Sequence, residues 1–461
     1  MSIPRAGLPT MPPTSATLAL AVALALCSFA ARGQSLTEVV DAARTYDATY
    51  LGARSTADAA RYRYEQARAL HLPSANLVVT AAKQSSGTPY VPSDTNSSST
   101  SYGGTVSAQQ TIFNRQNDLQ IDAAQKSADI AAAQLAQAEQ DLLVRVSQAY
   151  FNVLAAADAL QTVQANSKAI AEQLASAKRN FEVGNATITD TREAEARSDL
   201  ARSQEISAEN DLQVAKVTLD QLVGRNGIAP HPLALPATLP PVMPAQGSDW
   251  VALAESDSPT LLQARLNLEI AQLDTARAKA GHLPTLVAGA QYGRTHDRES
   301  YSTADAAVYG PGGTYGGTGF NRGVSLTLTV PLFAGFATQN RVRETVSLEE
   351  KARTDAEGAR NSVTVSTRTA FLSAQSLNAK VKALEAAESS SKLALDATVL
   401  GYKVGVKVNL DVLNAQSQLF STQRDLAAAR YNYLLSTLQL RQAAGTLTAN
   451  DLLAINALLV K

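Results

Sequence analysis

The stretch FEVGNATITD, residues 181–190, returns as YKVGVKVNLD, residues 402–411, after 221 positions. Each copy begins with an aromatic residue, continues with Val-Gly two residues later, and has Asp at its tenth position. Glycine permits the backbone conformation that ends a helix, and Thr, Asn and Asp cap helix starts. We therefore predict that each copy is the turn of a helical hairpin, with the next helix starting near Thr189-Asp190 and near Asn409-Asp411.

Further landmarks recur in the same order along the chain. ARALHLPSANL (67–77) resembles AKAGHLPTLVA (278–288) at an offset of 211, and TIFN around Phe113 resembles VPLFAG around Phe333 at an offset of 220. The added residues of the second copy therefore lie between His-Leu-Pro and Phe. Such self-similarity indicates an internal duplication. The copies are joined by a Pro-rich stretch, residues 226–249, which cannot continue a helix.

The duplication predicts a domain organisation. We expect a signal peptide at 1–33, a first repeat at 34–225, a linker at 226–248, a second repeat at 249–445, and a C-terminal segment at 446–461. Each repeat is expected to contain a helix, a β-hairpin and a long helical hairpin. The first helices are predicted at about 36–70 and 249–280, and the β-hairpins at 75–113 and 286–333.

The predicted strands alternate in character. VSLTLTV, residues 324–330, has apolar residues on one face and hydroxyl residues on the other. Polar loops are predicted at 85–104 and 294–321, because both stretches are rich in Gly, Ser and Thr. Short alternating strands joined by long polar loops fit the hairpins of membrane barrels, although a soluble hairpin would have a similar pattern.

Long helices are predicted at about 117–180 and 338–400, since neither segment contains proline. About 60 residues at 1.5 Å each would form a rod of roughly 90 Å, which no globular domain needs. Second helices are predicted at about 190–222 and 411–443. Short turns between long helices form antiparallel helical hairpins.

Composition limits the possible functions. The 461 residues contain 40 Lys and Arg and 41 Asp and Glu, a net charge of −1, which provides no electrostatic reason to expect a nucleic-acid partner. LALAVALALC, residues 18–27, is typical of a signal peptide cleaved before Gln34 and is too short to span a bilayer. Cys27 is the only cysteine, so the mature chain has no disulfide. No later apolar run approaches 18 residues, so an exported membrane protein of this sequence would be a β-barrel.

No pattern in the sequence indicates an enzyme or a cofactor. The four histidines, at positions 71, 231, 282 and 296, have no metal-ligand spacing. His71 and His282 precede Leu-Pro at predicted helix ends, where a structural role is expected. The Gly-rich stretch at 310–319 lacks the spacing of a phosphate-binding loop. We therefore expect neither catalytic residues, nor a metal, nor a cofactor.

Five motifs carry a resemblance that covers essentially the whole mature chain in order. They are QAYFNVLAAADAL (148–160), FEVGNATITD, GHLPTL (281–286), GYKVGVKVNLDVLNA (401–415) and ARYNYLLSTLQLRQAAGTLTANDLLAINALL (429–459). The chain resembles the TolC family of outer-membrane factors. The resemblance implies a mainly α-helical homotrimer with a membrane β-barrel. Each protomer would supply four strands to a 12-stranded barrel, which a long α-helical periplasmic tunnel would continue.

The resemblance also implies a function. The chain would be the outer-membrane channel of a tripartite efflux pump or of a type I secretion system, with a periplasmic extension. Such a passive exit duct is opened at its periplasmic end by an adaptor (a membrane fusion protein) and an inner-membrane transporter. The alternative is a periplasmic coiled-coil adaptor or scaffold, which would have one helical hairpin and a compact β domain. The sequence leaves the cargo open between drugs and a secreted protein toxin.

Site residues follow from the resemblance, position by position. The periplasmic gate would comprise Thr189, Asp190, Tyr402 and Lys407. The family usually has Arg where this chain has Lys407, and Lys lacks the bidentate fork, so we expect a looser link.

The pore constriction and the docking surface follow in the same way. The constriction would comprise Asp411 and Asn414, where the family's best-known member has two Asp residues. Three rather than six carboxylates per trimer predict weaker cation selectivity. The adaptor would dock on the hairpin ends, at Val183, Gly184, Val404 and Gly405.

Overall fold

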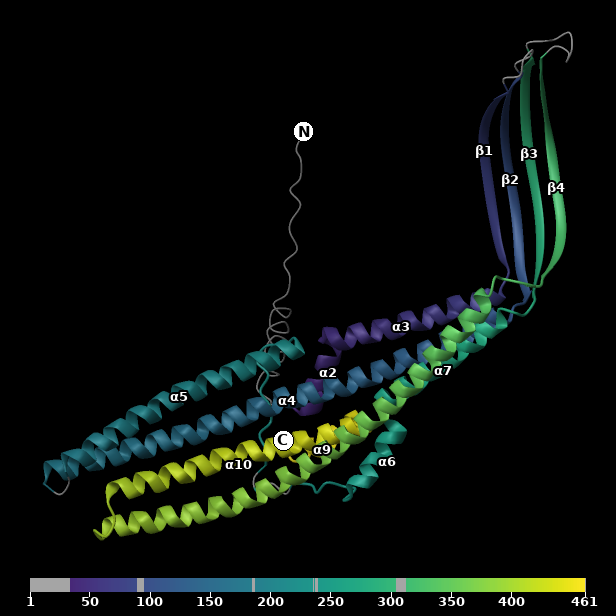
Figure 1. The fold of residues 1–461 in the computed structure, drawn as a ribbon. Helices are drawn as coiled ribbons and strands as arrows, with labels where there is room; N and C mark the ends of the chain where they lie inside the picture. The colour runs from purple at the N-terminus through teal and green to yellow at the C-terminus, as the bar shows by residue number, and fades with distance from the viewer. Residues whose placement is uncertain are drawn as a thin grey trace, which may run out of the picture. The chain divides into compact units, whose positions relative to one another are not determined.

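The computed structural model describes residues 34–88, 95–184, 187–234, 236, 239–303 and 312–460. The predicted signal peptide lies outside these residues. The chain forms two compact units, each built from both halves of the sequence (Figure 1). The first unit runs to Leu51 and adds residues 137–258 and 363–461. The second unit comprises residues 52–136 and 259–362.

Each half of the chain begins with two helices, and the prediction of one continuous helix is wrong. Helices α2 (Leu36–Tyr46) and α3 (Ala48–Arg68) are separated by Asp47, whose carboxylate accepts a hydrogen bond from Tyr50 N at 2.8 Å. This bond caps the start of α3. Helices α6 (Gly247–Asp257) and α7 (Pro259–Ala280) are separated by Ser258. The ring of Pro259 disfavours helical backbone at the preceding residue.

The long helices lie where the sequence predicts them, with ends shifted by at most three residues. They are α4 (Arg115–Glu182), α5 (Ile188–Val223), α9 (Ala337–Lys403) and α10 (Asn409–Ala443). A short helix, α11 (Ala449–Asn456), follows α10. Among the helices of the described residues, none is both long enough and apolar enough to cross a membrane.

Four antiparallel strands form one sheet in the order β1-β2-β3-β4. They are β1 (Ser74–Thr88), β2 (Thr95–Phe113), β3 (Thr285–Thr303) and β4 (Gly313–Thr329). Strand β1 follows the short 3₁₀ helix η1 (Ala69–His71), and β3 follows α7. Strand β2 leads into α4, and β4 leads toward α9. The helix-connected ends of all four strands therefore lie together at one end of the sheet.

The strands are longer than predicted, because much of the two predicted polar loops is strand. The ladder between β1 and β2 continues through Ser85↔Ser98 to Thr88↔Thr95, and the ladder between β3 and β4 reaches Tyr301↔Gly313. Backbone hydrogen bonds form equally well beneath small polar side chains, so a Ser/Thr-rich composition did not indicate where the strands end. The described strands place these polar residues within the sheet.

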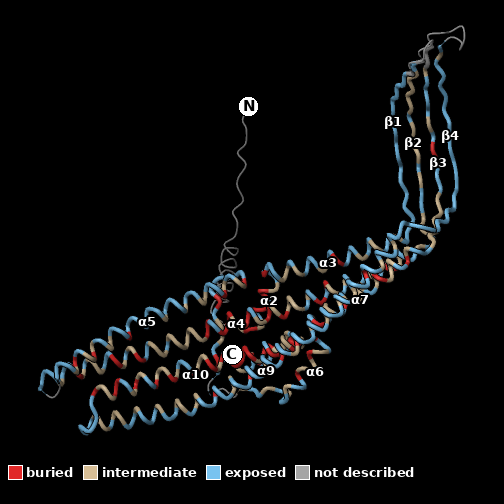
Figure 2. Tube along the Cα trace, viewed as in Figure 1, coloured by how far each residue is buried: buried red, intermediate tan, exposed pale blue. Residues whose placement is uncertain are grey.

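The main hydrophobic core of the first unit gathers α2, α4, α5, α10 and α11. Phe151 of α4 is 2% exposed, and its ring stacks on that of Tyr431 of α10 with centroids 6.0 Å apart. The neighbouring Tyr150 hydroxyl donates to Gln34 O at 3.0 Å and accepts from His231 N at 2.8 Å. Burial raises the pKa of Tyr150. Figure 2 shows that buried residues concentrate here, whereas both hairpin ends are largely exposed.

Two acidic side chains are held in the core region in opposite ways. Asp47, 7% exposed, pairs with both guanidinium nitrogens of Arg145, at 3.0 and 3.2 Å. Burial alone would raise the pKa of Asp47, but hydrogen bonds from Arg145 and from backbone N–H groups hold it below its ordinary value. Asp158 accepts a hydrogen bond from the Tyr431 hydroxyl at 2.8 Å. Burial raises the pKa of Asp158 more than Tyr431 and Arg430 lower it.

Candidate functional site at the ends of the helical hairpins

Glycine ends the first helix of each hairpin. Gly184 has φ +80° and its amide donates to Phe181 O at 3.0 Å. Gly405 also has φ +80°, and its amide donates to Tyr402 O at 3.1 Å. Other residues are strained in this left-handed conformation because of their Cβ atom. The repeated Val-Gly therefore stops α4 and α9 in the same way, as the sequence predicts.

The helix that follows the first turn begins with a complete capping box. Thr187 Oγ1 accepts from Asp190 N at 3.1 Å, and the Asp190 carboxylate accepts from Thr187 N at 3.0 Å. Thr187 Oγ1 also donates to that carboxylate at 2.7 Å. The prediction that Thr189-Asp190 starts the helix is thus corrected: the cap is Thr187, and Asp190 lies three residues inside. Thr189 is exposed.

The helix that follows the second turn has only one of the two bonds of a capping box. Its N-cap is Val408, which has no side-chain oxygen, rather than a residue within the predicted start at 409–411. The Asp411 carboxylate accepts from Val408 N at 3.4 Å and lies 3.6 Å from Lys407 Nζ. The second Asp therefore accepts one long backbone bond and keeps an ion pair on the surface.

Three of the four predicted gate residues line one cavity of about 430 Å³ between the hairpin ends. Asp190 contributes from the first hairpin, and Tyr402 and Lys407 contribute from the second. Thr189 is not among the lining residues. The gate role of all four residues stays a prediction.

The hydrogen bond that joins the two hairpins at this cavity runs from Asn180 Nδ2 to the Tyr402 hydroxyl, at 3.3 Å. Among the described residues, no such bond links Asp190 to Tyr402 or Lys407. Sequence reasoning missed Asn180. Its counterpart in the second copy is Gly401, so the repeat contained no signal for it.

The two predicted constriction residues lie on the first turns of α10. Asn414 is exposed, and its Oδ1 accepts from Arg197 Nη2 of α5 at 3.3 Å. Asp411 accepts the backbone bond from Val408 N and makes the ion pair with Lys407 described above. Asn414 thus forms a second polar contact between the hairpins, and its role in a constriction stays a prediction.

The predicted docking residues lie at the exposed turns. Val183 is 68% exposed and Val404 is 66% exposed, and a Cβ added at Gly184 or Gly405 would meet no atom within 4 Å. Val406, which was not predicted, is 79% exposed. The turns therefore present apolar side chains to their surroundings, and the role of these residues in adaptor docking stays a prediction.

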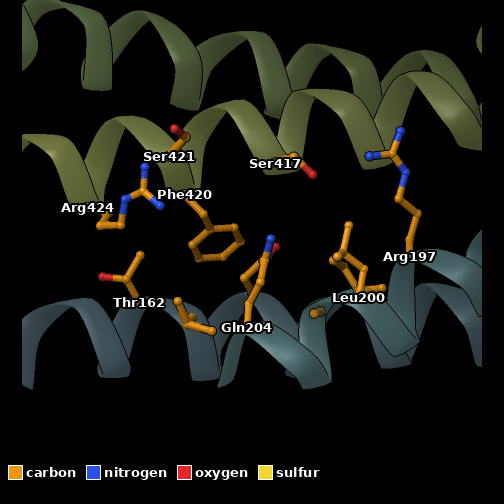
Figure 3. A pocket seen from close by; sticks show the side chains of 12 residues that line it. Thr162, Arg197, Leu200, Gln204, Ser417, Phe420, Ser421 and Arg424 are labelled. Atoms are coloured by element: carbon orange, nitrogen blue, oxygen red, sulfur yellow. The ribbon is translucent and has the colours of Figure 1, made fainter. Parts of the chain in front are cut away.

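A second cavity, of about 230 Å³, lies between α4, α5 and α10 (Figure 3). Arg197 and Arg424 flank it, with Phe420 and Gln204 between them. Asn166 also lines it, and its buried Oδ1 has no hydrogen-bond partner in the described part of the chain. The hairpins are therefore not tightly packed against each other along this stretch.

The described residues contain no group of three or more His, Cys, Asp or Glu side chains that could hold a metal ion. His71 Nε2 lies 3.4 Å from Asp118 Oδ1, and the His71 carbonyl accepts from Gln110 Nε2 at 2.6 Å. These contacts join the end of η1 to β2 and α4, which is the structural role expected at this position.

Comparison with known proteins decides the family. The family model described as outer membrane efflux protein matches residues 35–225 and 250–446. The chain belongs to the outer membrane efflux protein family. Outer membrane protein TolC of Vibrio cholerae is 32% identical over 445 residues, which cover 95% of this chain and 97% of that protein. Alkaline protease secretion protein AprF of Pseudomonas aeruginosa is 31% identical over 76% of this chain and 71% of that protein.

Solved structures agree on the fold. The crystal structure of CusC, a protein described as forming a transmembrane channel, matches with a TM-score of 0.73 and 17% identity, over 90% of this chain and 92% of that chain. The predicted fold class is confirmed: the chain is mainly helical with four strands per protomer and has the fold of trimeric channels that join a barrel to a helical tunnel. The protein is an outer-membrane channel rather than an enzyme. This result excludes the alternative of a periplasmic coiled-coil adaptor.

Proposed function

We propose that this protein is the passive exit duct of a tripartite efflux pump or type I secretion system. It would be recruited by a periplasmic adaptor and opened with an inner-membrane transporter, which supplies the energy. The observation that carries the proposal is the similarity to TolC over 95% of the chain, together with the channel fold. The family is described by efflux, and the relative AprF is described by protease secretion. Both drugs and a secreted protein are therefore compatible with the duct as cargo.

The sheet supports assembly into a homotrimer. Strands β1 and β4 each pair on one side only, which leaves two edges in the described sheet. Unpaired edges are strongly unfavourable in a membrane, where no water can satisfy their N–H and C=O groups. Pairing of β4 with β1 of the next protomer would remove every edge and produce twelve strands from three copies.

The hairpin ends support a gate that partners can open. Near the ends, the hairpins of one protomer are joined by the bonds Asn180–Tyr402 and Arg197–Asn414, both at 3.3 Å. The first bond is partly buried and the second is exposed. Polar contacts of this kind contribute about 1 kcal/mol each. We propose that Thr189, Asp190, Tyr402 and Lys407 act at this gate and that Asp411 and Asn414 face the pore.

The exposed turns complete the proposal. Val183 and Val404, with Gly184 and Gly405 beside them, form apolar surfaces that a partner could cover. Docking there would act directly on the cavity lined by Asp190, Tyr402 and Lys407. Adaptor binding and gate opening would thus be coupled through a few residues of the same turns.

Single-channel conductance in a planar bilayer tests the duct and its gate. We expect a small, steady conductance from the wild-type protein and a larger one from Asp190→Ala. This variant removes the carboxylate that completes the capping box of α5 and that lines the shared cavity. Asp199→Ala is the matched control, because it removes an exposed acid of α5 away from the cavity. Folded wild-type protein that does not conduct would contradict the duct, and equal conductance of both variants and wild type would contradict the gate.

A further inference from the structure

The two faces of the sheet differ in chemistry. Side chains directly opposite each other in an antiparallel ladder share a face, so the register assigns every strand residue to one side. One face contains Ser, Thr, Asn, Gln and Gly at most positions. Its residues surround a hollow of about 500 Å³, lined among others by Asn76, Ser107, Gln109, Gln291 and Thr327. We call this the polar face.

Glycines on the polar face make room for its side chains. A Cβ on Gly103 would lie 2.9 Å from the Thr295 side chain, and a Cβ on Gly289 would lie 2.9 Å from Ser325 Oγ. Ser101 Oγ also donates to Asp297 on this face, at 2.6 Å. These contacts show that neighbouring strands place small and polar groups together on the same face.

The opposite face is apolar at its helix-connected end. Its exposed large side chains are Leu77, Val79, Val106, Val324, Leu326 and Leu328. In the proposed barrel, this apolar face meets lipid and the polar face lines the lumen. The inference below rests on that proposed function.

The charges of the strands separate between the two faces. The register places the four Lys and Arg residues of the strands, and His296, on the apolar face; the four are Lys83, Arg294, Arg298 and Arg322. The two acids, Asp297 and Glu299, are on the polar face. None of the four cations has an ion pair among the described residues. The apolar face therefore carries unneutralised positive charge.

This charge lies at a defined height. Arg294 is nine residues from Thr285, the helix-connected end of β3. At about 3.4 Å per residue and a tilt of about 40°, it stands about 23 Å above the strand start, near the outer limit of an apolar band about 25 Å tall. Arg322 lies somewhat lower, and its long side chain can reach upward. At that height a cation meets lipid headgroups rather than acyl chains.

Two of the arginines are arranged as a pair. Arg294 is opposite Phe320 and Arg322 is opposite Tyr292, so the guanidinium groups are diagonal neighbours separated by aromatic rings. The Arg322 guanidinium lies 5.9 Å from the centroid of the Phe320 ring. Lys83 and Arg298 are both opposite Thr100, on either side of β2, and extend the charge across three strands.

We propose that Arg294 and Arg322 bind the phosphomonoester headgroup of a lipid in the outer leaflet. A guanidinium donates two parallel hydrogen bonds to a phosphate, and two guanidiniums match the double charge of a monoester. The aromatic rings between them pack against the glycerol or sugar region at the membrane interface. No carboxylate of the described strands lies on this face to compete for the arginines.

Lipid retention by the purified full-length protein tests the proposal. The protein is incubated with mixed micelles of phosphatidylcholine and phosphatidic acid, which carries a phosphomonoester, and bound lipid is measured by native mass spectrometry. We expect preferential retention of phosphatidic acid. Retention should fall about fivefold in Arg294→Gln and in Arg322→Gln, and further in the double variant, because each cation near an anionic headgroup contributes by about this factor. Arg202→Gln, on α5, is the control and should retain wild-type binding.

Each outcome bears on the proposal separately from the duct. Equal retention of both lipids, or unchanged retention in the double variant, would overturn the lipid site. Binding of inorganic phosphate alone with comparable affinity would overturn the assignment to a lipid. Conductance of the same preparations is recorded in parallel. A conducting protein without lipid preference keeps the duct and loses the site, whereas a folded protein that does not conduct contradicts the duct.

Discussion

The core of the first unit and the ends of its hairpins are stabilised by different interactions, although α4 and α10 contribute to both (Figure 2). In the core, aromatic rings stack and acids are buried against partners, as in Phe151–Tyr431 and Asp47–Arg145. At the ends, caps, turn glycines and polar bonds at partly buried or exposed positions predominate. The comparison suggests that one chain can keep a rigid core while its hairpin ends separate at a cost of only a few weak bonds.

The two ends also differ from each other. The first is closed by the reciprocal bonds of Thr187 and Asp190, whereas the second has Val408 in the corresponding position. Duplication therefore preserved the glycine and the acid but not the cap. The second end, which also carries Tyr402 and Lys407, is expected to be the more easily deformed of the two.

The same substitution at two positions of α4 should give the largest difference in stability loss between the core and the hairpin ends. Phe151→Ala should lower the free energy of unfolding by about 3–5 kcal/mol, because it leaves a cavity in a closely packed core. Phe181→Ala, on the same helix but 42% exposed, should cost about 1 kcal/mol or less. Denaturant unfolding followed by circular dichroism measures both. Similar losses for the two variants would contradict the contrast.

The acids of the core predict a smaller, pH-dependent effect. Because the pKa of Asp158 is raised in the folded state, stability falls as the pH rises from its unfolded value, near 3.9, through the folded value. Asp158→Asn keeps an acceptor for the Tyr431 hydroxyl and removes the charge. We expect this variant to match wild type below about pH 4 and to be more stable at neutral pH.

Asp47→Asn should change the pH dependence of stability in the opposite direction to Asp158→Asn. The pKa of Asp47 is lowered in the folded state, so its contribution is present above the unfolded value and is lost as the pH falls through the folded value. This variant should therefore lose stability at neutral pH and lose less at acidic pH. Thermal unfolding from about pH 3 to pH 8 measures both variants. A difference from wild type that is constant across this range would show that neither acid behaves as a buried group.

Exchange of the two caps should give effects of about 1 kcal/mol. Thr187→Val removes the side-chain oxygen that accepts from Asp190 N, and Val408→Thr introduces one three residues before Asp411. We expect amide hydrogen exchange to accelerate at the start of α5 in the first variant and to slow at the start of α10 in the second. Unchanged exchange in Val408→Thr would mean that the missing cap does not explain the looser second end.

The sequence predicted the hairpins and their turns because a repeat doubles each local signal. Gly184 and Gly405 are required by the backbone, so their pattern is visible without a structure. Asn180 could not be predicted, since it bonds to Tyr402 across 222 positions and has no counterpart in the second copy.

The two helix breaks and the strand lengths, which the sequence analysis predicted wrongly, have local causes. The break at Ser258 follows from Pro259, a signal that was present in the sequence. The break at Asp47 is a cap in a stretch whose apolar spacing continues through it. The strand lengths were missed because Ser- and Thr-rich strands have the composition of loops. One cavity is lined by Asp190, Tyr402 and Lys407. This arrangement depends on how the two hairpins pack against each other, which no local sequence pattern encodes.

The smallest effect on stability is expected at Lys407. Its ammonium lies 3.6 Å from Asp411, and the two side chains are 51% and 39% exposed. Such a pair contributes about 0.5 kcal/mol or less, because solvent screens it. Lys407→Gln should therefore leave amide exchange at the start of α10 almost unchanged. Lys403→Gln, which changes a second lysine lining the same cavity, is the matched control.

Conductance separates a gate role of Lys407 from a structural one. If Lys407 acts at the gate, Lys407→Gln should raise the resting conductance while Lys403→Gln does not, with stability equal in both. Lys407→Arg should lower the conductance, because a guanidinium can hold a carboxylate with two bonds where an ammonium acts as a point charge. A loss of stability above about 1 kcal/mol in Lys407→Gln would place this pair with the core interactions rather than the weak ones. In that case, the hairpin ends would not be the easily separated part of the molecule.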